Sequence, residues 1–387
     1  MNILHIDFTG TFNEDMLYQE NLLTTYQSRD GHSVTMLATC YEFDNKGNVC
    51  FVRPVNKLMQ NGVRLIRMNY HKIINHYITC KLRKVDGVFD LMRQLNPDII
   101  FFHGPQTVEL LTIVKYLKCF KSARLFIDNH ADFSNSASNF ISLYLLHKLF
   151  WRIIASRAVP YTSKFFGTIP ARVDFLLNVY NIPGEKCELL LFGVDNDRIS
   201  QLRQNNERKN IRIRSGFLES DFLIITGGKI NSAKSQVFNL VKAITNLNSK
   251  NIKLLIFGSI DNVFKEELLS FVENNKVFYL GWLNSDEICS YFMASDLAIF
   301  PGRHSVLWEQ ATGAGLPCFF KYWDGTTHLD LGGNCRFLYK NNEEEIRLLL
   351  EELINNPDSY SKMKSVAEEK GILTFSYRKI ARQAIQN

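Results

Sequence analysis

Two glycines and two lysines stand close together in this chain of 387 residues, and their spacing suits the binding of phosphate groups. Residues 222–226 predict a buried strand, and apolar residues at helical spacing from 237 predict a helix. Between them, Gly227 and Gly228 let a ligand approach the backbone, and Lys229 and Lys234 offer two ammonium groups. The stretch therefore predicts a cradle for a diphosphate.

The start of the following helix would add to this cradle. Free backbone N–H groups at a helix start attract anions, and Ser232 or Ser235 is placed to cap the helix. The alternative interpretation is an ordinary strand-to-helix connection with solvated lysines. The stretch is not a Walker loop, because the G-x-x-x-x-G-K-[ST] spacing is absent.

The composition is that of an ordinary globular protein, with 46% hydrophobic and 22% charged residues. The length favours two domains. Eight cysteines form no C-x-x-C pair, which argues against zinc and fits reduced thiols in a cytoplasmic protein. Met1 leads directly into an apolar stretch, and the most apolar helix, 140–154, contains Lys148 and Arg152. We therefore expect neither a signal peptide nor a membrane span.

Strands and helices are predicted to alternate along the chain. In the first half, strands are expected at 3–8, 33–38, 63–68, 98–102 and 124–127, with a short one near Val159. Helices are expected there at 17–29, 85–95, from about 139, and 171–179. A polar, basic run up to Arg214 suggests a linker. In the second half, strands are expected at 222–226, 253–257, 277–280, 297–300 and 318–320, with a last helix at 377–385.

Strands separated by helices predict parallel, doubly wound sheets of the α/β class. Such sheets bind ligands at the carboxyl ends of their strands. Gly10, His103 and His130 all follow predicted strands, so they are candidates for that edge.

Several motifs give the sequence a family resemblance. ILHI, YQEN, GHSVTML, GVDND, GGKINSAKS, IKLLIFGS and WEQATGAGLP occur in the order typical of GT-B glycosyltransferases, and the chain resembles retaining family 4 of that fold. The resemblance implies two Rossmann-like domains facing each other across a cleft, with 1–198 on the acceptor side and 199–370 binding a nucleotide-sugar donor. Residues 371–387 would form a helix that packs back on the first domain. No metal or other cofactor is expected.

The same resemblance assigns residues to the donor. Its diphosphate would lie on Lys229, Lys234 and the turn of Gly227 and Gly228, with Gly10 nearby from the first domain. Further donor-binding residues would be Gly258, Ser259, Trp282, His304, Ser305, Val306, Leu307 and Gln310.

The stretch from Pro301 to Pro317 departs from the family pattern. The family has two glutamates eight residues apart here, the second of which binds the ribose, but Pro301 stands eight before Glu309. Counting back from Pro317 places Gln310 at the ribose position, whereas a one-residue insertion restores Glu309. We favour Glu309, because a carboxylate accepts from both ribose hydroxyls. The alternative is that Glu309 only stabilises the start of its helix.

His130 is the strongest candidate near the reacting bond. By resemblance it matches the histidine that contacts the donor sugar, and Asp128 and Asp132 are placed to set its tautomer or charge. The alternative is a histidine that only caps a strand end. His103, Asp128 and Asp132 are weaker candidates on the acceptor side.

Asp195 and Asp197 form a D-x-D pattern that resembles a metal site of another glycosyltransferase fold. We do not expect metal there, because the two lysines already neutralise the phosphates.

Between residues 45 and 85 there are nine Lys or Arg and no Asp or Glu, interleaved with apolar residues. The stretch 46–84 is a candidate surface for an anionic membrane, beside a lipid-linked acceptor. A solvated basic face on a protein of net charge +6 is the alternative. Nucleic acid is not expected as a partner, because no binding module is recognised.

These observations favour a retaining glycosyltransferase that moves a sugar from a nucleotide diphosphate to a hydroxyl of a surface glycan, at the cytoplasmic side of a membrane. Two other classes stay open. One is an epimerase or hydrolase of the same fold, which would act on the donor without an acceptor. The other is a catalytically silent nucleotide-sugar-binding partner, which the missing glutamate favours.

Overall fold

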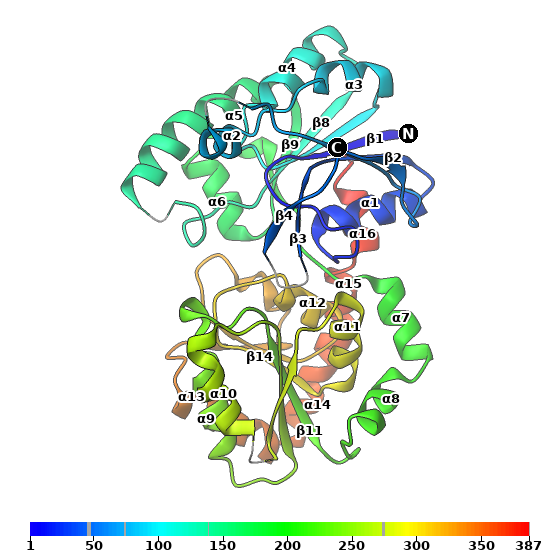
Figure 1. Ribbon diagram of the computed structural model, residues 1–387. Coiled ribbons are helices and arrows are strands. Elements are labelled where there is room, and N and C mark those ends of the chain that lie inside the picture. Colours follow the sequence, from blue (N-terminus) through cyan, green and yellow to red (C-terminus); the bar gives the residue numbers. More distant parts are fainter. Residues whose placement is uncertain (45–47, 73–74, 138, 273–274, 387) are drawn as a thin grey trace. The chain divides into compact units, whose positions relative to one another are not determined.

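The computed structural model describes residues 1–44, 48–72, 75–137, 139–272 and 275–386 (Figure 1). The chain divides into two compact units. Unit 1 comprises Met1–Leu191 together with Arg378–Asn387, and unit 2 comprises Phe192–Tyr377. Each unit contains one large sheet with helices in its connections.

The sheet of unit 1 has eight strands in the order β10-β9-β8-β7-β1-β2-β6-β5. All neighbours are parallel except β5 and β6. Its strands are β1 (Asn2–Asp7), β2 (Ser33–Thr39), β5 (Asn56–Leu58), β6 (Arg64–Met68), β7 (Ile99–His103), β8 (Arg124–Asn129), β9 (Thr162–Gly167) and β10 (Cys187–Leu189). The short strands β3 (Tyr41–Phe43) and β4 (Val49–Phe51) form a separate antiparallel pair.

Helices cover the sheet of unit 1, with α3 and α4 above it and α1 and α16 below it in Figure 1. They are α1 (Gln19–Arg29), α2 (His76–Leu82), α3 (Val88–Leu95), α4 (Leu110–Cys119), the π-helix η1 (Ile141–Trp151), α5 (Arg152–Ala158), α6 (Pro170–Asn178) and α16 (Tyr377–Gln383), with 3-10 turns η2 (Val159–Tyr161) and η3 (Gly184–Lys186). Apolar side chains from β1 and β7, such as Ile6 and Phe102, are fully buried in the core.

The sheet of unit 2 is entirely parallel, in the order β13-β12-β11-β14-β15-β16. Its strands are β11 (Phe222–Gly227), β12 (Ile252–Phe257), β13 (Val277–Gly281), β14 (Leu297–Phe300), β15 (Cys318–Lys321) and β16 (Cys335–Leu338). Its helices are α7 (Asn196–Gln204), α8 (Glu207–Arg214), η4 (Ser232–Lys234), α9 (Val237–Thr245), α10 (Asn262–Val272), α11 (Ser285–Ala294), α12 (Leu307–Gly313), η5 (Thr327–Leu329), α13 (Glu343–Asn355), α14 (Pro357–Val366), η6 (Ala367–Gly371) and α15 (Ile372–Thr374).

The predicted α/β class and the two parallel, doubly wound sheets are confirmed. The strand expected near Val159 is β9, which begins three residues later, at Thr162, because Val159–Tyr161 forms a 3-10 turn containing Pro160. Strands β5, β10 and β16 were not predicted. They lie at sheet edges and span only three or four residues each, too few to show a periodic pattern.

The basic run before Arg214 is not a linker, because it forms helices α7 and α8 within unit 2. Few apolar residues mark these helices, yet Ile199, Leu202 and Ile211 are buried. Arg212 is also buried, and its guanidinium lies 2.6 Å from the Asp296 carboxylate. A buried ion pair thus replaces part of the apolar signal that would have predicted the helices.

The C-terminal helix α16 is joined to unit 1 by side chains from two elements. Gln27 on α1 donates to the Ala381 carbonyl, and Arg382 pairs with Asp30 at 2.7 Å. Gln383 donates to the carboxylate of Glu188 on β10. The last ten residues therefore complete a unit whose other residues precede unit 2.

Candidate active site

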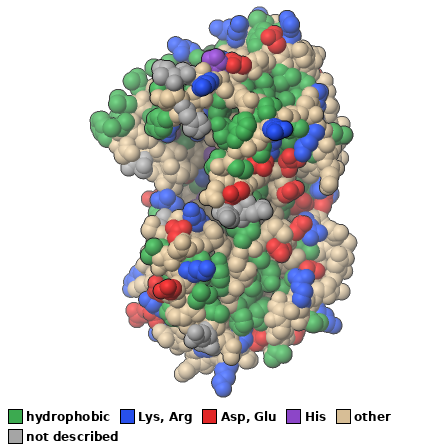
Figure 2. All heavy atoms as spheres, viewed as in Figure 1, with side chains coloured by type: hydrophobic (Ala, Val, Ile, Leu, Met, Phe, Trp, Pro, Cys, Tyr) green, Lys and Arg blue, Asp and Glu red, His purple; other side chains and the backbone are tan. Residues whose placement is uncertain are grey.

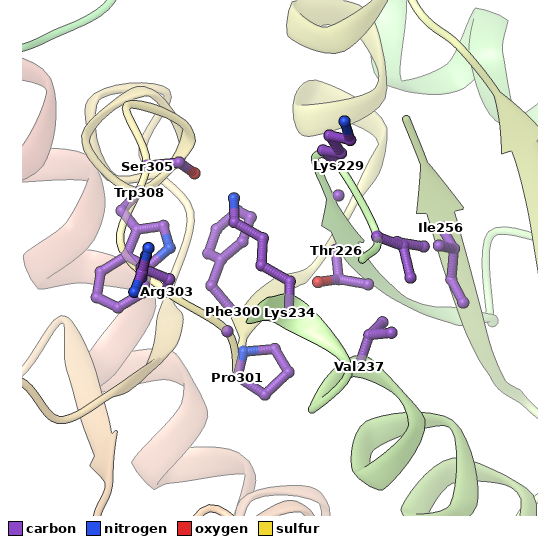
Figure 3. Close-up of a pocket in the computed structure, with 13 residues that line it drawn as sticks. Thr226, Lys229, Lys234, Val237, Ile256, Phe300, Pro301, Arg303, Ser305 and Trp308 are labelled. Carbon is purple, nitrogen blue, oxygen red and sulfur yellow. The ribbon is translucent and has the colours of Figure 1, made fainter. Parts of the chain in front are cut away.

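The predicted cradle lies at the carboxyl end of β11 in unit 2. Its residues Gly227, Lys229 and Lys234 line a pocket together with residues from the loop after β14 and the start of α12, namely Pro301, Gly302, Arg303, Ser305 and Trp308. Figure 3 shows Lys234 lying across the middle of this pocket, with Trp308 and Arg303 on one side and Thr226 and Lys229 on the other. The described side chains that line it include three cations and no carboxylate. Such a pocket favours an anion.

Glycines at the base of the cradle allow two turns to touch. A Cβ added to Gly258 would lie 2.1 Å from the Gly228 carbonyl oxygen, and one added to Gly227 would lie 2.3 Å from the Phe257 ring. Gly228 and Gly258 both have φ near +114°, a conformation that L side chains rarely adopt. Glycines at these three positions therefore position the cradle by close packing.

Lys234 lies in the middle of the pocket (Figure 3), close to the like charge of Arg303. Its ammonium lies 3.4 Å from the Cβ position of Gly228. Burial, and secondarily the nearby Arg303, lower the pKa of Lys234. A bound anion would relieve both effects, because it supplies the opposite charge that the free pocket lacks.

The predicted serine caps are wrong. Helix α9 begins at Val237, and its N-cap residue Gln236 makes no side-chain cap bond. Ser235 donates instead to the Ser232 carbonyl, within the single turn η4 that carries Lys234. The turn, and not a helix cap, thus positions this lysine.

Glu309 lies on α12 and is fully buried. Its Oε1 atom is 2.8 Å from His304 Nε2 and 2.9 Å from His328 Nε2. Burial alone would raise the pKa of Glu309, but the two histidines lower it to about 2. The carboxylate therefore stays ionised and holds two imidazoles in place.

This geometry bears on the choice between Glu309 and Gln310. Among the described residues that line the pocket, neither Glu309 nor Gln310 is found, and Gln310 is itself only 8% exposed. Oε2 of Glu309 is buried and has no hydrogen-bond partner among the described residues. It is the acceptor that remains available on this carboxylate.

The other predicted donor residues lie around the same strand ends. Ser305 lines the pocket, whereas Leu307 is buried at the start of α12 and Val306 is its N-cap residue. The Ser259 carbonyl accepts from the Ile230 amide, which joins the two glycine turns. Trp282 is 58% exposed just after β13.

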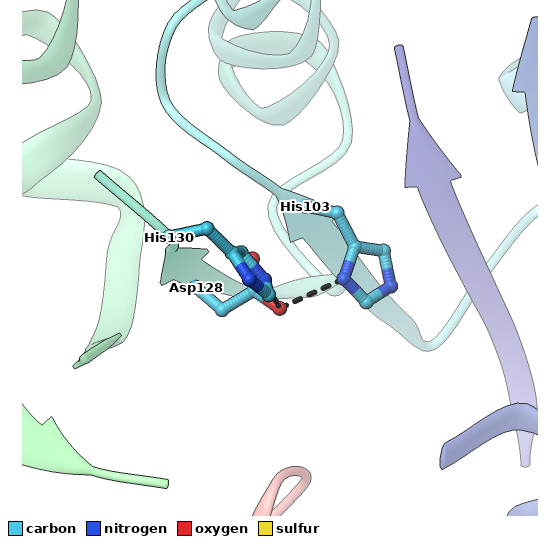
Figure 4. Close-up of side chains that lie close together, drawn as sticks. All are labelled: His103, Asp128 and His130. Atoms are coloured by element: carbon cyan, nitrogen blue, oxygen red, sulfur yellow. Dashed lines mark hydrogen bonds and ion pairs between the residues drawn. The ribbon is translucent and has the colours of Figure 1, made fainter. Parts of the chain in front are cut away.

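In unit 1, three predicted residues come together at the ends of β7 and β8 (Figure 4). Asp128 Oδ2 lies 2.8 Å from His103 Nδ1 and 3.3 Å from His130 Nε2. Asp128 and His103 are buried, and the His130 side chain is 38% exposed. His130 is thus the accessible end of a buried charged pair.

Protonation of this cluster follows from its hydrogen bonds. Burial alone would lower the pKa of His103, but Asp128 raises it to about 9, so His103 is a cation at neutral pH. Its Nδ1–H donates to Asp128, and its Nε2–H donates to His5 Nδ1 at 3.0 Å. Burial and then His103 lower the pKa of His5 to about 3, so neutral His5 donates to Gln27 Oε1 at 2.7 Å. Every proton in this row has an acceptor.

Two acidic residues lie beside the cluster. The Gly10 amide donates to Asp7 Oδ1 at 3.2 Å, which places the Gly10 loop over the end of β1. Glu20, in the first turn of α1, interacts with Asp7, His103 and His130. Burial, followed by Asp7, raises the pKa of Glu20 to about 7. The site therefore includes a carboxyl group that titrates near neutral pH.

Asp132 does not join this cluster. Its carboxylate accepts from Ser134 and Asn135, and it pairs with Arg172 at 3.1 Å. Asp132 thus shapes the loop after His130, and Asp128 alone carries out the predicted contact with the imidazole.

Among the described residues, distances alone would allow metal ligation at one place. Ligand atoms of His103, Asp128 and His130 lie within 4.8 Å of one another. A cation on His103 Nδ1 would have to displace the proton donated to Asp128. In the predicted D-x-D pattern, Asp195 instead caps α7 by accepting from the Arg198 amide.

The basic stretch 46–84 is only partly a surface. Arg67 is buried and donates to the Thr39 and Phe12 carbonyls, so its membrane role is wrong. Lys57 pairs with Glu14 at 2.9 Å, and Lys84 lies 3.5 Å from Glu109. Carboxylates from outside the stretch therefore offset part of its charge. Lys46 and residues 73–74 lie outside the described residues.

Sequence reasoning missed His5, Glu20, Arg303 and His328 as site residues. His5 lies inside an apolar strand, and His328 stands nineteen residues after the carboxylate it contacts. Neither had a local pattern to reveal it. Glu20 lies inside the recognised motif YQEN, and Arg303 lies in the short loop after the predicted strand 297–300, so a search for charged residues in and beside the motifs would have found both.

Comparisons with known proteins agree with this arrangement. Residues 207–370 match the family model described as glycosyl transferases group 1, which covers most of unit 2. No curated protein sequence matches the chain.

Solved structures match nearly the whole chain. A glycosyltransferase from Rickettsia africae ESF-5 has a TM-score of 0.71 and 15% identity, over 99% of this chain and 96% of the other. Anabaena Alr3699/HepE in complex with UDP has a TM-score of 0.70 and 15% identity, over 99% and 98%. WaaG, a glycosyltransferase involved in lipopolysaccharide biosynthesis, has a TM-score of 0.66 and 15% identity, over 100% of both chains. Identities this low show a shared fold.

The two doubly wound units are those of the GT-B fold. The family match of unit 2, together with this fold, defines the protein as an enzyme of the glycosyltransferase class. The predicted resemblance to GT-B glycosyltransferases is thereby confirmed. None of the helices formed by the described residues is long and apolar enough to cross a bilayer.

Proposed function

We propose that the protein transfers a sugar, with retention of its anomeric configuration, from a nucleotide diphosphate to a hydroxyl of a lipid-linked surface glycan. The observation that carries this proposal is the cation-lined cradle of unit 2, in the part of the chain that matches the transferase family. Lys229 and Lys234 supply the two charges that a diphosphate requires.

The cradle would act most strongly during bond breaking. As the anomeric bond lengthens, negative charge grows on the leaving diphosphate, and preformed cations stabilise that charge more than the ground state. Lys234 is already positioned by η4 and the glycine turns, so little reorganisation is needed. No metal is required in this proposal, because the lysines provide the electrostatic stabilisation.

In this proposal His130 contacts the donor sugar, as the family resemblance implies. Its Nε2 side faces Asp128, so the pair would orient the imidazole and stabilise positive charge near the reacting carbon. Glu309 remains the proposed ribose contact through its available oxygen, with Gln310 as the alternative. Retention of configuration follows from the same resemblance.

UDP is the first nucleotide to test, since HepE was solved with UDP. A surface glycan as acceptor is supported by WaaG, whose description names lipopolysaccharide biosynthesis. The protein would then work at the cytoplasmic face of a membrane, as a peripheral enzyme.

A thermal-shift screen tests the donor proposal directly. UDP, ADP and GDP, each alone and as a sugar conjugate, are added to wild type and to Lys234→Ala. A ligand that binds only the folded state raises the unfolding temperature. We expect one nucleotide series to stabilise wild type and not the variant. Equal shifts in both proteins would remove the phosphate role of Lys234.

Incubation with the identified donor alone then separates the three classes. A transferase should release free sugar only slowly without acceptor. Rapid release of free or epimerised sugar would indicate the epimerase or hydrolase. Binding without turnover across a panel of lipid-linked acceptors would indicate a silent partner.

A further inference from the structure

The outward side of η1 and of the adjoining α5 exposes an unusual number of large apolar side chains. We call six of them the apolar face: Phe140, Ile141, Tyr144, Leu145, Leu149 and Ile153. Their exposed fractions run from 43% to 70%. Figure 2 shows hydrophobic side chains gathered at the upper left, where Figure 1 draws these helices. A contiguous exposed apolar patch of this kind marks a contact surface.

The exposure is a consequence of helical spacing and not of loose packing. Exposed apolar residues recur every four or five positions, which i→i+5 bonding brings to one side of the helix. On the opposite side His147 and Trp151 are buried. His147 Nδ1 lies 2.8 Å from the Tyr180 hydroxyl, so the helix is fixed to unit 1 by its inner face.

Positive charge accompanies the apolar face. Helices η1 and α5 together contain three Lys or Arg and no Asp or Glu. Lys148 lies 4.7 Å from the Tyr144 ring, and Arg152 follows η1 directly. The partner of this face is therefore both apolar and anionic.

We infer that the apolar face lies on an anionic lipid leaflet, with its apolar side chains among the acyl chains and Lys148 and Arg152 among the headgroups. An interfacial helix binds in this way, through buried apolar area and attraction to acidic lipids. The inference deepens the proposed function and rests on it for the lipid-linked acceptor. It moves the membrane contact from 46–84 to η1.

The apolar face is tied to the candidate catalytic histidine by a short row of hydrogen bonds. Gln106 Nε2 donates to the Tyr180 hydroxyl at 2.8 Å and to Asn129 Oδ1 at 2.9 Å. Tyr180 in turn contacts His147 of η1, and Asn129 directly precedes His130. A membrane bound at η1 would thus be held in a fixed relation to His130 within unit 1.

Flotation with vesicles tests this inference without any need for donor or acceptor. Vesicles of phosphatidylcholine and phosphatidylglycerol in equal parts are compared with phosphatidylcholine alone. The variant Leu145→Ser with Leu149→Ser should partition about a hundredfold more weakly than wild type, because two exposed apolar anchors are lost. The matched control is Leu218→Ser with Val263→Ser, which removes two exposed apolar residues of unit 2 and should bind like wild type.

A charge arm completes the test. Lys148→Glu with Arg152→Glu should abolish the preference for phosphatidylglycerol, and added salt should weaken wild-type binding. Lys57→Glu with Arg64→Glu, in the stretch 46–84, should bind like wild type. Unchanged binding of the η1 variants would overturn the inference. So would a wild-type dimer that ignores vesicles and dissociates in Leu145→Ser with Leu149→Ser, because the face would then join two copies. Nucleotide binding in the thermal-shift screen reports on the proposed function separately.

Discussion

The cradle of unit 2 and the histidine cluster of unit 1 are built by different means. In the cradle, the backbone packs closely at three glycines and leaves a pocket that cationic side chains line. The glycines are Gly227, Gly228 and Gly258, and the cations are Lys229, Lys234 and Arg303. In the cluster, side chains at three neighbouring strands share protons along a row that runs from buried His5 to the accessible His130. The first site is specified by shape, whereas the second is specified by protonation. Mutations that change side-chain volume should therefore affect the cradle, and changes of pH should affect the histidine cluster.

The largest effect is expected for Gly258→Ala. Its new Cβ would meet the Gly228 carbonyl oxygen at 2.1 Å, and the residue has a φ of +114°. We expect unit 2 to lose about 3–4 kcal/mol of stability or more, by overpacking and backbone strain. Chemical denaturation measures it. Gly10→Ala is the matched control, because its Cβ would lie at an ordinary 3.5 Å from Asp7. Equal losses in both variants would contradict the packing argument.

The next effect concerns pH in unit 1. The pKa of His103 is about 9 in the folded chain against an ordinary value of 6.5. Its pairing with Asp128 therefore stabilises unit 1 fully below about pH 6.5, and this stabilisation is lost as pH rises through 9. Linkage gives about 3 kcal/mol for the full loss. Amide exchange of β8 between pH 6.5 and 9 measures it, and Asp128→Asn should flatten the dependence.

Glu309→Gln is the control for that experiment. The pKa of Glu309 is lowered to about 2 from an ordinary 4.5, so its stabilisation is present above pH 4.5 and is lost as pH falls through 2. Glu309 does not change its protonation between pH 6.5 and 9, so it should contribute no pH dependence to the amide exchange of β14 in that range. A wild-type alkaline loss that survives in Asp128→Asn would show that another group is responsible.

Lys234→Ala should weaken donor binding by roughly 10- to 150-fold, which corresponds to the 1.5–3 kcal/mol of a charge-assisted contact. Lys229→Ala should have a smaller effect, because Lys229 is exposed at the edge of the pocket. Titration calorimetry with the nucleotide identified by thermal shift measures both. Lys242→Ala, an exposed lysine on α9, is the control and should bind normally.

A smaller effect separates Glu309 from Gln310. When the residue that contacts the ribose is changed to alanine, the enzyme should lose about 1 kcal/mol of its preference for ribose over deoxyribose donors. Relative kcat/KM for the two donors measures this in Glu309→Ala and Gln310→Ala. Loss of preference in Gln310→Ala alone would place the ribose one residue later than proposed.

The smallest effect is expected from metal removal. Transfer should continue unchanged after treatment with EDTA, because lysines carry the charge of the leaving diphosphate. Loss of activity that Mg²⁺ or Mn²⁺ restores would contradict this, and His103, Asp128 and His130 would be the first residues to examine.

The sequence predicted most of the fold because buried parallel strands are continuous apolar runs, such as 99–102 and 222–225. It predicted the cradle because glycine and lysine act there at short spacing along the chain. Contacts between distant residues were beyond it. His328 reaches Glu309 across nineteen residues, and Arg212 reaches Asp296 across eighty-four. Which side of the apolar helix 140–154 is exposed was also beyond the sequence, because that depends on the neighbours of the helix.

The return of the chain to unit 1 has a consequence for the order in which the protein is made. Residues 378–387 leave the ribosome after all of unit 2, yet Ala381 accepts a bond from Gln27 and Arg382 pairs with Asp30. Unit 2 is continuous and has its whole sequence available first. During synthesis, unit 1 with its histidine cluster therefore stays incomplete until the whole of unit 2 with its cradle has been made.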